Sequence, residues 1–222
     1  MLNFAYDAVF FDLDGTLYDT AKDIIPTIIA TCEQANISPA AYEEIAPMSA
    51  YSSRHMLAAA LRTSLTDERL DKLMPIFYQL YTEQAGKIAR PFPGIEALIQ
   101  FLEQHKIAWG IVTNKATQPT KALLKRQHLT HRLSALVCAD TLPYAKPYPD
   151  PILLACAQCN IAPNRAIFLG DAPSDIQAGN AAGVTTVACL WGYLTQDAQP
   201  ENWSADFLIH HPNDLLSLLN TL

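Results

Sequence analysis

The sequence predicts an α/β fold in which a parallel sheet is covered by helices on both faces and carries an all-helical insertion. Short apolar runs of strand length alternate with amphipathic helical segments over most of the chain, which is typical of a parallel sheet. One long stretch, residues 18–90, breaks this rhythm, because it shows helical periodicity and no convincing strand pattern.

Each expected strand is a short apolar run, and most are followed by turn or polar residues. The first strand covers residues 8–13 and ends in Asp-Gly, and further strands are expected at residues 107–113, 134–139, 166–170, 184–190 and 205–211. Helices are expected at residues 95–106, from 117, at 149–160 and 175–182, and from 212.

The helical stretch predicts a second structural part. It returns to the strand–helix pattern at residues 90–94, Arg-Pro-Phe-Pro-Gly, which form a stiff, turn-rich connection. We therefore expect a core from residues 1–17 and 91–222 and an inserted helical cap from residues 18–90. A chain of 222 residues is long enough for a core and a small inserted domain.

Composition and charge exclude several classes of protein. With 15 basic and 22 acidic side chains the net charge is −7, which argues against a nucleic-acid partner. The N-terminal segment has no basic region and Asp7 interrupts its apolar stretch, and no apolar run reaches membrane-spanning length. We expect a cytoplasmic protein without a membrane partner, either a monomer or a homodimer.

The five cysteines fit reduced thiols. Cys156 and Cys159 form a C-x-x-C pair, but they lie in a helical pattern without a second pair of ligands. We interpret them as helix residues that face the core, with a redox or zinc role as the alternative.

Two acids stand at the end of the first strand, in Asp12-Leu13-Asp14-Gly15-Thr16. Ligands of open α/β sheets bind beyond the carboxyl ends of the strands, so the two carboxylates stand at the functional edge. A hard cation such as Mg²⁺ would neutralise them. One acid can attack phosphorus and another can exchange protons, although a pair of turn-capping aspartates has the same pattern.

Three further groups follow strands or stand in a stiff loop. Thr113-Asn114 offers a hydroxyl and loop N–H groups to phosphate oxygens, with an ordinary helix N-cap as the alternative. Lys146 lies in a proline-framed loop and suits a fixed countercharge to phosphate, although a solvated loop lysine is the alternative. Asp171 and Asp175 can complete an oxygen shell for Mg²⁺, or cap the turn and helix that follow.

Together, the segments FFDLDGTLYDT, IVTNK, AKPYPDP and GDAPSD resemble the four motifs of the haloacid dehalogenase (HAD) superfamily. The order and spacing of these four segments resemble those of the HAD phosphatases that have a Rossmann-like core and a helical cap. Among these, the chain is similar to the phosphoglycolate phosphatases and to the N-acetylmuramic acid 6-phosphate phosphatases. GIVTNKATQPT, VCADTLPYAKPYPDPILLA and WGYL look more like the second group.

The resemblance implies a role for each motif residue. Asp12 would be the nucleophile and a metal ligand, and Asp14 the general acid and base, with its carbonyl also on Mg²⁺. Thr113 and Lys146 would hold the transferring phosphoryl group, and Asn114 is a candidate for substrate binding. Asp171 would bind the metal, and Asp175 would orient the metal's waters or Lys146. These roles predict a Mg²⁺-dependent phosphatase that forms an aspartyl-phosphate on a small anionic phosphate ester.

The cap is expected to select the substrate. Arg54 is a candidate for a second anionic contact, because its guanidinium can bind a carboxylate in a bidentate fork, although an exposed helix-end residue is an equal alternative. Tyr18 and Thr20 are candidates for the entrance between cap and core.

Other activities stay as alternatives at this point. The full acid set argues against a dehalogenase, whereas a sugar-phosphate mutase on the same scaffold stays open. A phosphorylated receiver domain without turnover has similar acids, but such domains are shorter and lack an inserted cap.

Overall fold

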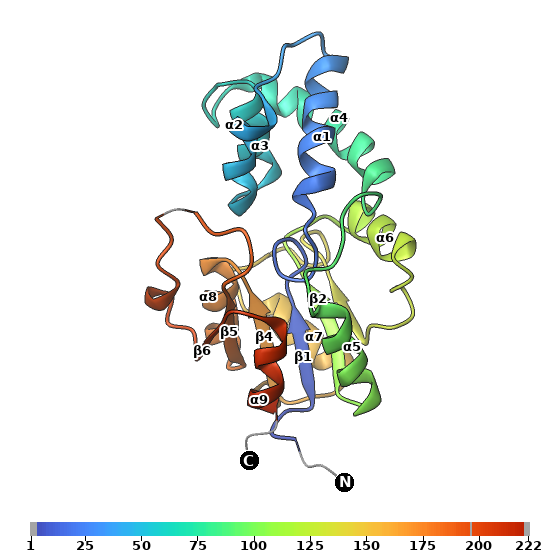
Figure 1. Cartoon of the computed structure of the whole chain (residues 1–222), viewed down its shortest axis with the longest axis vertical. Coiled ribbons are helices and arrows are strands. Elements are labelled where there is room, and N and C mark those ends of the chain that lie inside the picture. The colour runs from blue at the N-terminus through green and yellow to red at the C-terminus, as the bar shows by residue number, and fades with distance from the viewer. Residues whose placement is uncertain (1–3, 196, 220–222) are drawn as a thin grey trace. The chain divides into compact units, whose positions relative to one another are not determined.

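The computed structural model describes residues 4–195 and 197–219. A parallel sheet of six strands forms its centre, in the order β3-β2-β1-β4-β5-β6 (Figure 1). The predicted α/β fold is confirmed, and every strand lies inside its predicted run. The strands are β1 Ala8–Phe11, β2 Ala108–Val112, β3 Ala135–Val137, β4 Ala166–Gly170, β5 Thr185–Cys189 and β6 Phe207–Ile209.

Helices cover both faces of the sheet, with α5 and α9 in front and α7 behind in Figure 1. Helices α7 and α8 pack together, and Ile152, Cys156 and Ala178 join Phe10 and Phe168 in one buried apolar cluster. The helices of this part are α5 Ile95–Gln104, α7 Asp150–Cys159, α8 Pro173–Ala182 and α9 Leu215–Leu219. Short 3₁₀ turns lie at η2 Pro163–Arg165, η3 Pro200–Asn202 and η4 Pro212–Asp214.

The secondary structure of residues 20–90 consists of helices and one 3₁₀ turn joined by loops. They form α1 Ala21–Gln34, α2 Tyr42–Ile45, the 3₁₀ turn η1 Ala46–Ala50, α3 Ser53–Ala60 and α4 Glu68–Gln84. Helix α4 begins after Asp67, whose side chain accepts a hydrogen bond from the Arg69 N–H at 2.9 Å and caps the helix. Helices α1 and α4 pack on one another through their apolar sides.

Contacts within the chain divide it into two compact units. The first contains residues 1–19, 91–117 and 129–222, and the second contains residues 20–90 and 118–128. Most of helix α6, Thr117–Arg126, therefore belongs with the helical unit, where Gln127 donates from Nε2 to the Gly86 carbonyl at 2.7 Å. The sequence pattern assigned these residues to the core, because a helix between two strands of one sheet normally packs on that sheet. The roles of core and cap stay predictions.

Two features of the fold agree with the composition. No helix in the described part of the chain is both long and apolar enough to cross a membrane. The five cysteines are free; Cys156 is buried in the core cluster and Cys159 packs against it. Burial raises the pKa of Cys156 to about 11, so this thiol is protonated at neutral pH.

Candidate active site

The sheet topology brings three motifs to one edge. β1 lies between β2 and β4, with Phe11 paired to Ile111 on one side and to Leu169 on the other. Asp12 directly follows β1, Thr113 follows β2 and Asp171 follows β4, so all three stand at the carboxyl ends of neighbouring parallel strands. This is the switch point of the strand order, where open α/β sheets bind ligands.

Lys146 connects the acids of this edge. Its ammonium Nζ donates to Asp12 Oδ1 at 2.8 Å, lies 2.7 Å from Asp175 Oδ1, and donates to the Val112 carbonyl at 2.8 Å. An ammonium has three N–H donors, and these three acceptors use all of them. The side chain is 2 % exposed, so its charge is fully committed inside the site.

The backbone around Lys146 is held by Asn114. The Asn114 amide donates from Nδ2 to the Lys146 carbonyl at 2.9 Å and accepts at Oδ1 from the Lys146 N–H at 3.0 Å. This two-bond pairing ties the loop after β2 to the loop that carries the lysine. Asn114 therefore positions Lys146, while its predicted contact with substrate stays a prediction. Thr113 is 4 % exposed, and its hydroxyl Oγ1 accepts from the Lys115 N–H at 3.2 Å.

Both oxygens of Asp171 have hydrogen-bond donors. Thr16 donates from Oγ1 to Asp171 Oδ1 at 2.9 Å, and the Tyr193 N–H donates to Oδ2 at 2.8 Å. Gly15 has a φ of +84°, and a Cβ at that position would fall 2.1 Å from Asp171 Oδ2. Glycine is required there both for the backbone conformation and for the room that the carboxylate occupies.

Asp175 has a supporting position. Its Oδ1 faces Lys146, and its Oδ2 accepts from the Ala172 N–H at 3.0 Å at the start of α8. Asp175 thus caps the helix and contacts Lys146 at the same time, while its predicted place in a Mg²⁺ shell stays a prediction. Its carboxylate is buried, with 1 % of the residue exposed.

Burial and crowding shift the protonation of these groups. Burial raises the pKa of Asp12 to about 6; Lys146 opposes this rise, and the carboxylates of Asp175 and Asp14 add to it. Burial also raises the pKa of Asp171 well above its usual range, with Asp12 and Asp175 contributing. Burial alone would lower the pKa of Lys146, but the carboxylates of Asp12 and Asp175 hold it above its usual range.

The donor set fits a hard divalent cation. Asp12, Asp171 and Asp175 each offer a carboxylate oxygen, and these oxygens all lie within 4.8 Å of one another. One ammonium among three carboxylates leaves negative charge uncompensated, which adds to the effect of burial on the raised pKa values. Mg²⁺ prefers oxygen ligands from a few carboxylates and would supply the missing positive charge.

The comparisons with known proteins agree with this geometry. Residues 9–189, which include all four motifs, match the family described as haloacid dehalogenase-like hydrolase. The chain belongs to this family. The predicted superfamily is confirmed, and the chain is an enzyme of the hydrolase class.

Relatives of the HAD family cover nearly the whole chain. An N-acetylmuramic acid 6-phosphate phosphatase from Pseudomonas aeruginosa is 36% identical over 213 residues, which are 96% of this chain and 94% of the relative. A phosphoglycolate phosphatase from Xanthomonas campestris pv. campestris is 37% identical over 208 residues, 94% of either chain. A predicted phosphoglycolate phosphatase from Haemophilus somnus has the same fold, with a TM-score of 0.82, 23% identity and coverage of 96% of this chain and 98% of that chain.

The roles of Arg54, Tyr18 and Thr20 as substrate contacts stay predictions. Arg54 donates from Nη1 to Asp71 Oδ1 at 2.6 Å and from Nε and Nη2 to the Leu65 carbonyl at 3.3 and 3.0 Å. Its guanidinium fork is therefore engaged inside the helical unit, and a substrate carboxylate would have to replace these acceptors. Tyr18 and Thr20 are buried, at 2% and 0% exposure.

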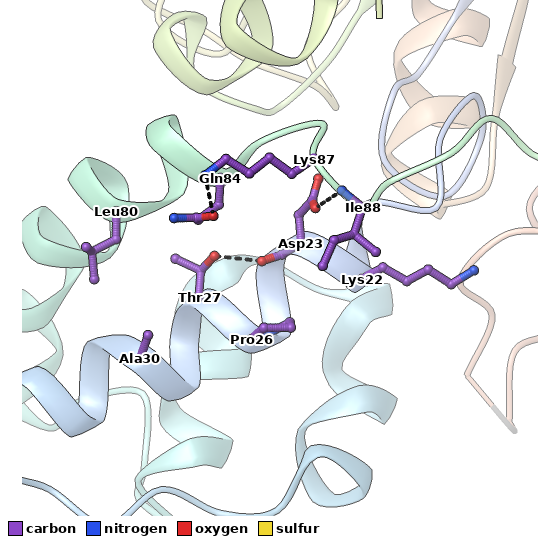
Figure 2. A pocket seen from close by; sticks show the side chains of 9 residues that line it. All are labelled: Lys22, Asp23, Pro26, Thr27, Ala30, Leu80, Gln84, Lys87 and Ile88. Atoms are coloured by element: carbon purple, nitrogen blue, oxygen red, sulfur yellow. Dashed lines mark hydrogen bonds between the residues drawn. The ribbon is translucent and has the colours of Figure 1, made fainter. Parts of the chain in front are cut away.

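One pocket in the helical unit is separate from the HAD motifs (Figure 2). It has a volume of about 190 Å³ and lies between α1, α4 and the segment around Ile88. Asp23 lies at this pocket, but its two oxygens accept from the backbone N–H groups of Gly86, Ile88 and Ala89. A carboxylate used in this way supports the fold, so Asp23 does not indicate an active site in this pocket.

Sequence reasoning missed three contributors to the HAD site. Thr16 and Tyr193 hold Asp171, and the Lys115 ammonium lies 2.7 Å from Asp14 Oδ1. The Tyr193 hydroxyl also donates to Asp19 Oδ1 at 2.8 Å. The segment that follows β5 stands at the same sheet edge as the motifs, and this position was the available signal for Tyr193.

Proposed function

We propose that this protein is a Mg²⁺-dependent phosphatase that hydrolyses a small anionic phosphate monoester through a phosphoryl group on Asp12. The observation that carries the proposal is the arrangement around Lys146, where one buried ammonium joins Asp12 to Asp175 beside Asp171. Membership in the HAD hydrolases and the names of the phosphatase relatives support the class of phosphoric monoester hydrolase.

The first chemical step transfers the phosphoryl group to the protein. A carboxylate oxygen of Asp12 attacks phosphorus, and the bond from phosphorus to the ester oxygen breaks. The carboxyl of Asp14 gives its proton to the leaving oxygen, which departs as an alcohol. Lys146 keeps one oxygen of Asp12 in a fixed place during the attack.

The second step returns Asp12 to its first state. Water loses a proton to the Asp14 carboxylate and attacks phosphorus, and the bond from phosphorus to the Asp12 oxygen breaks. Inorganic phosphate leaves, and Asp14 is again protonated for the next turnover. Mg²⁺ held by Asp12, Asp171 and the Asp14 carbonyl would stabilise the charge on the phosphoryl oxygens in both steps.

The substrate is proposed to be N-acetylmuramic acid 6-phosphate or 2-phosphoglycolate. Relatives with these two names match the chain at 36% and 37% identity, so overall identity does not separate them. Both compounds carry a carboxylate in addition to the phosphate. A cationic contact for that carboxylate is therefore expected, and Arg54 stays the candidate.

The test is phosphate release from a panel of monoesters that contains both compounds, with Mg²⁺ or with a chelator. Wild type should turn over many times with Mg²⁺, and Asp12→Asn should release no phosphate. Single turnover in ¹⁸O-labelled water should place the label in the released phosphate. Transfer to another position of a sugar phosphate would indicate a mutase, and wild type that releases no phosphate under any metal would overturn the proposal.

A further inference from the structure

A second buried lysine lies at the sheet edge and has no role in the proposed steps. The ammonium of Lys115 lies 2.7 Å from Asp14 Oδ1, and its side chain is 6% exposed against 27% for Asp14. The two residues are 101 positions apart in the chain. Lys115 follows Thr113 and Asn114 directly, at the carboxyl end of β2.

The main chain on both sides of Lys115 is held in place. Its N–H donates to Thr113 Oγ1 at 3.2 Å, and its carbonyl accepts from the Ala139 N–H at 3.0 Å. A side chain that starts from a fixed backbone and is almost fully buried has little rotational freedom. Its ammonium therefore defines a fixed point to which the Asp14 carboxyl is bound.

The two lysines divide the acids between them. Lys146 uses its three donors on Asp12, Asp175 and the Val112 carbonyl, so it has no donor left for Asp14. Lys115 makes the charge-assisted contact with Asp14 instead. A hydrogen bond to a charged group is roughly twice as strong as one between neutral groups, so this contact restricts the partly exposed side chain of Asp14 to one position.

We propose that Lys115 is a positioning residue that holds the Asp14 carboxyl where it exchanges protons with the leaving oxygen. This inference rests on the proposed function, since it needs Asp14 to act as the acid and base. Proton transfer by a positioned side chain contributes about 10²–10⁴-fold to rate. Loss of the Lys115 contact should remove part of that factor and leave phosphate binding and the attack by Asp12 in place.

The experiment compares two esters in Lys115→Met, wild type and Asp14→Asn. An alkyl phosphate needs a proton on its leaving oxygen, whereas p-nitrophenyl phosphate releases a weakly basic phenolate that does not. We expect kcat/KM of Lys115→Met to fall about 10–100-fold for the alkyl ester and much less for the nitrophenyl ester. kcat/KM reports the steps up to the phosphorylation of Asp12. Slow hydrolysis of the phosphorylated Asp12 therefore does not affect the comparison of the two esters.

A double-mutant cycle provides the second readout. Lys115→Met should have no further effect on the alkyl ester once Asp14→Asn is present, because the residues act as one unit. Lys115→Arg should restore part of the alkyl rate. Lys121→Met changes an exposed lysine of α6 and is the matched control, with wild-type rates expected.

The outcomes separate this inference from the proposed function. Equal losses on both esters, or additive effects with Asp14→Asn, would overturn it and assign Lys115 to phosphate binding or to stability. If Lys115→Met does not fold, Lys115→Gln should show the same preference for the nitrophenyl ester, with a smaller loss. Failure of the proposed function would show as a wild-type enzyme without Mg²⁺-dependent release, or as an active Asp12→Asn variant.

Discussion

Gly192 lies so close to Asp171 that a Cβ on Gly192 would fall 2.4 Å from the Asp171 Cβ and 2.5 Å from its Oδ2. Tyr193, the next residue, donates its N–H to the same carboxylate. The segment after β5 therefore fixes one proposed metal ligand both by contact and by hydrogen bonding. Groups of this kind orient a ligand that would otherwise rotate.

Gly192→Ala should weaken Mg²⁺ binding. The new methyl group displaces Asp171, and the concentration of Mg²⁺ for half-maximal activity should rise about 10–100-fold. A Mg²⁺ titration of phosphate release measures this, and thermal unfolding reports the loss of stability, about 1–3 kcal/mol from overpacking.

Gly183→Ala is the matched control for that substitution. Gly183 has a φ of +73°, and a Cβ added there would meet nothing within 4 Å, so alanine costs backbone strain without touching the site. An unchanged Mg²⁺ requirement in Gly192→Ala would show that Asp171 does not need this neighbour.

The metal-free protein should lose stability as pH rises through the titration of Asp12. Its pKa is raised from 3.8 to about 6 in the folded state. A pKa that is raised on folding contributes stability that is fully present below about pH 4 and is lost as pH rises through about 6. The free energy of unfolding should fall by about 2–3 kcal/mol over this range. Chemical denaturation with chelator, from pH 4 to 7.5, measures the change.

Asp12→Asn removes the titration of Asp12 together with the rise that its charge causes in the pKa of Asp171. Asp7 and Glu103, whose pKa values are lowered by arginine partners, act in the opposite direction and are present in both proteins. The stability of Asp12→Asn relative to wild type should increase from pH 4 to 7. Saturating Mg²⁺ should reduce the difference, because the cation favours the ionised carboxylates. A difference that is independent of pH would show that Asp12 keeps its ordinary pKa.

Asp23→Ala should destabilise the helical unit. The Asp23 carboxylate accepts from the N–H groups of Gly86, Ile88 and Ala89 at 2.6, 2.8 and 3.2 Å, and the residue is 2% exposed. Three backbone donors lose a charged acceptor, so unfolding free energy should fall by about 2–4 kcal/mol. Calorimetry measures the loss, and hydrogen exchange should quicken at those three amides.

Asp71→Ala is the control for Asp23→Ala. Asp71 pairs with Arg54 at 2.6 Å, but its side chain is 70% exposed, and such surface pairs are worth about 0–1 kcal/mol. A loss in Asp23→Ala no larger than that in Asp71→Ala would contradict the role given to the buried carboxylate.

The core motifs could be predicted because each depends on a local pattern and one topological rule. Asp12, Thr113 and Asp171 each follow an apolar run, and parallel strands place their carboxyl ends at one edge. Lys146 could be predicted as a candidate site residue because prolines frame its loop. Arg54 shows the limit of this reasoning, because no spacing indicates that its fork is engaged by Asp71 and the Leu65 carbonyl.

The sequence by itself determined the α/β class, the helical stretch from 18 to 90 and the set of acids at the strand ends, since hydrophobic periodicity and the residue that follows an apolar run are properties of neighbouring residues. Tertiary structure decided which side chains hold the acids. Lys115 reaches Asp14 across 101 residues, and Tyr193 reaches Asp171 across 22. Such contacts depend on how the loops fold back over the sheet edge. The packing of distant segments sets the positions of these loops, and it leaves no periodic pattern in the sequence.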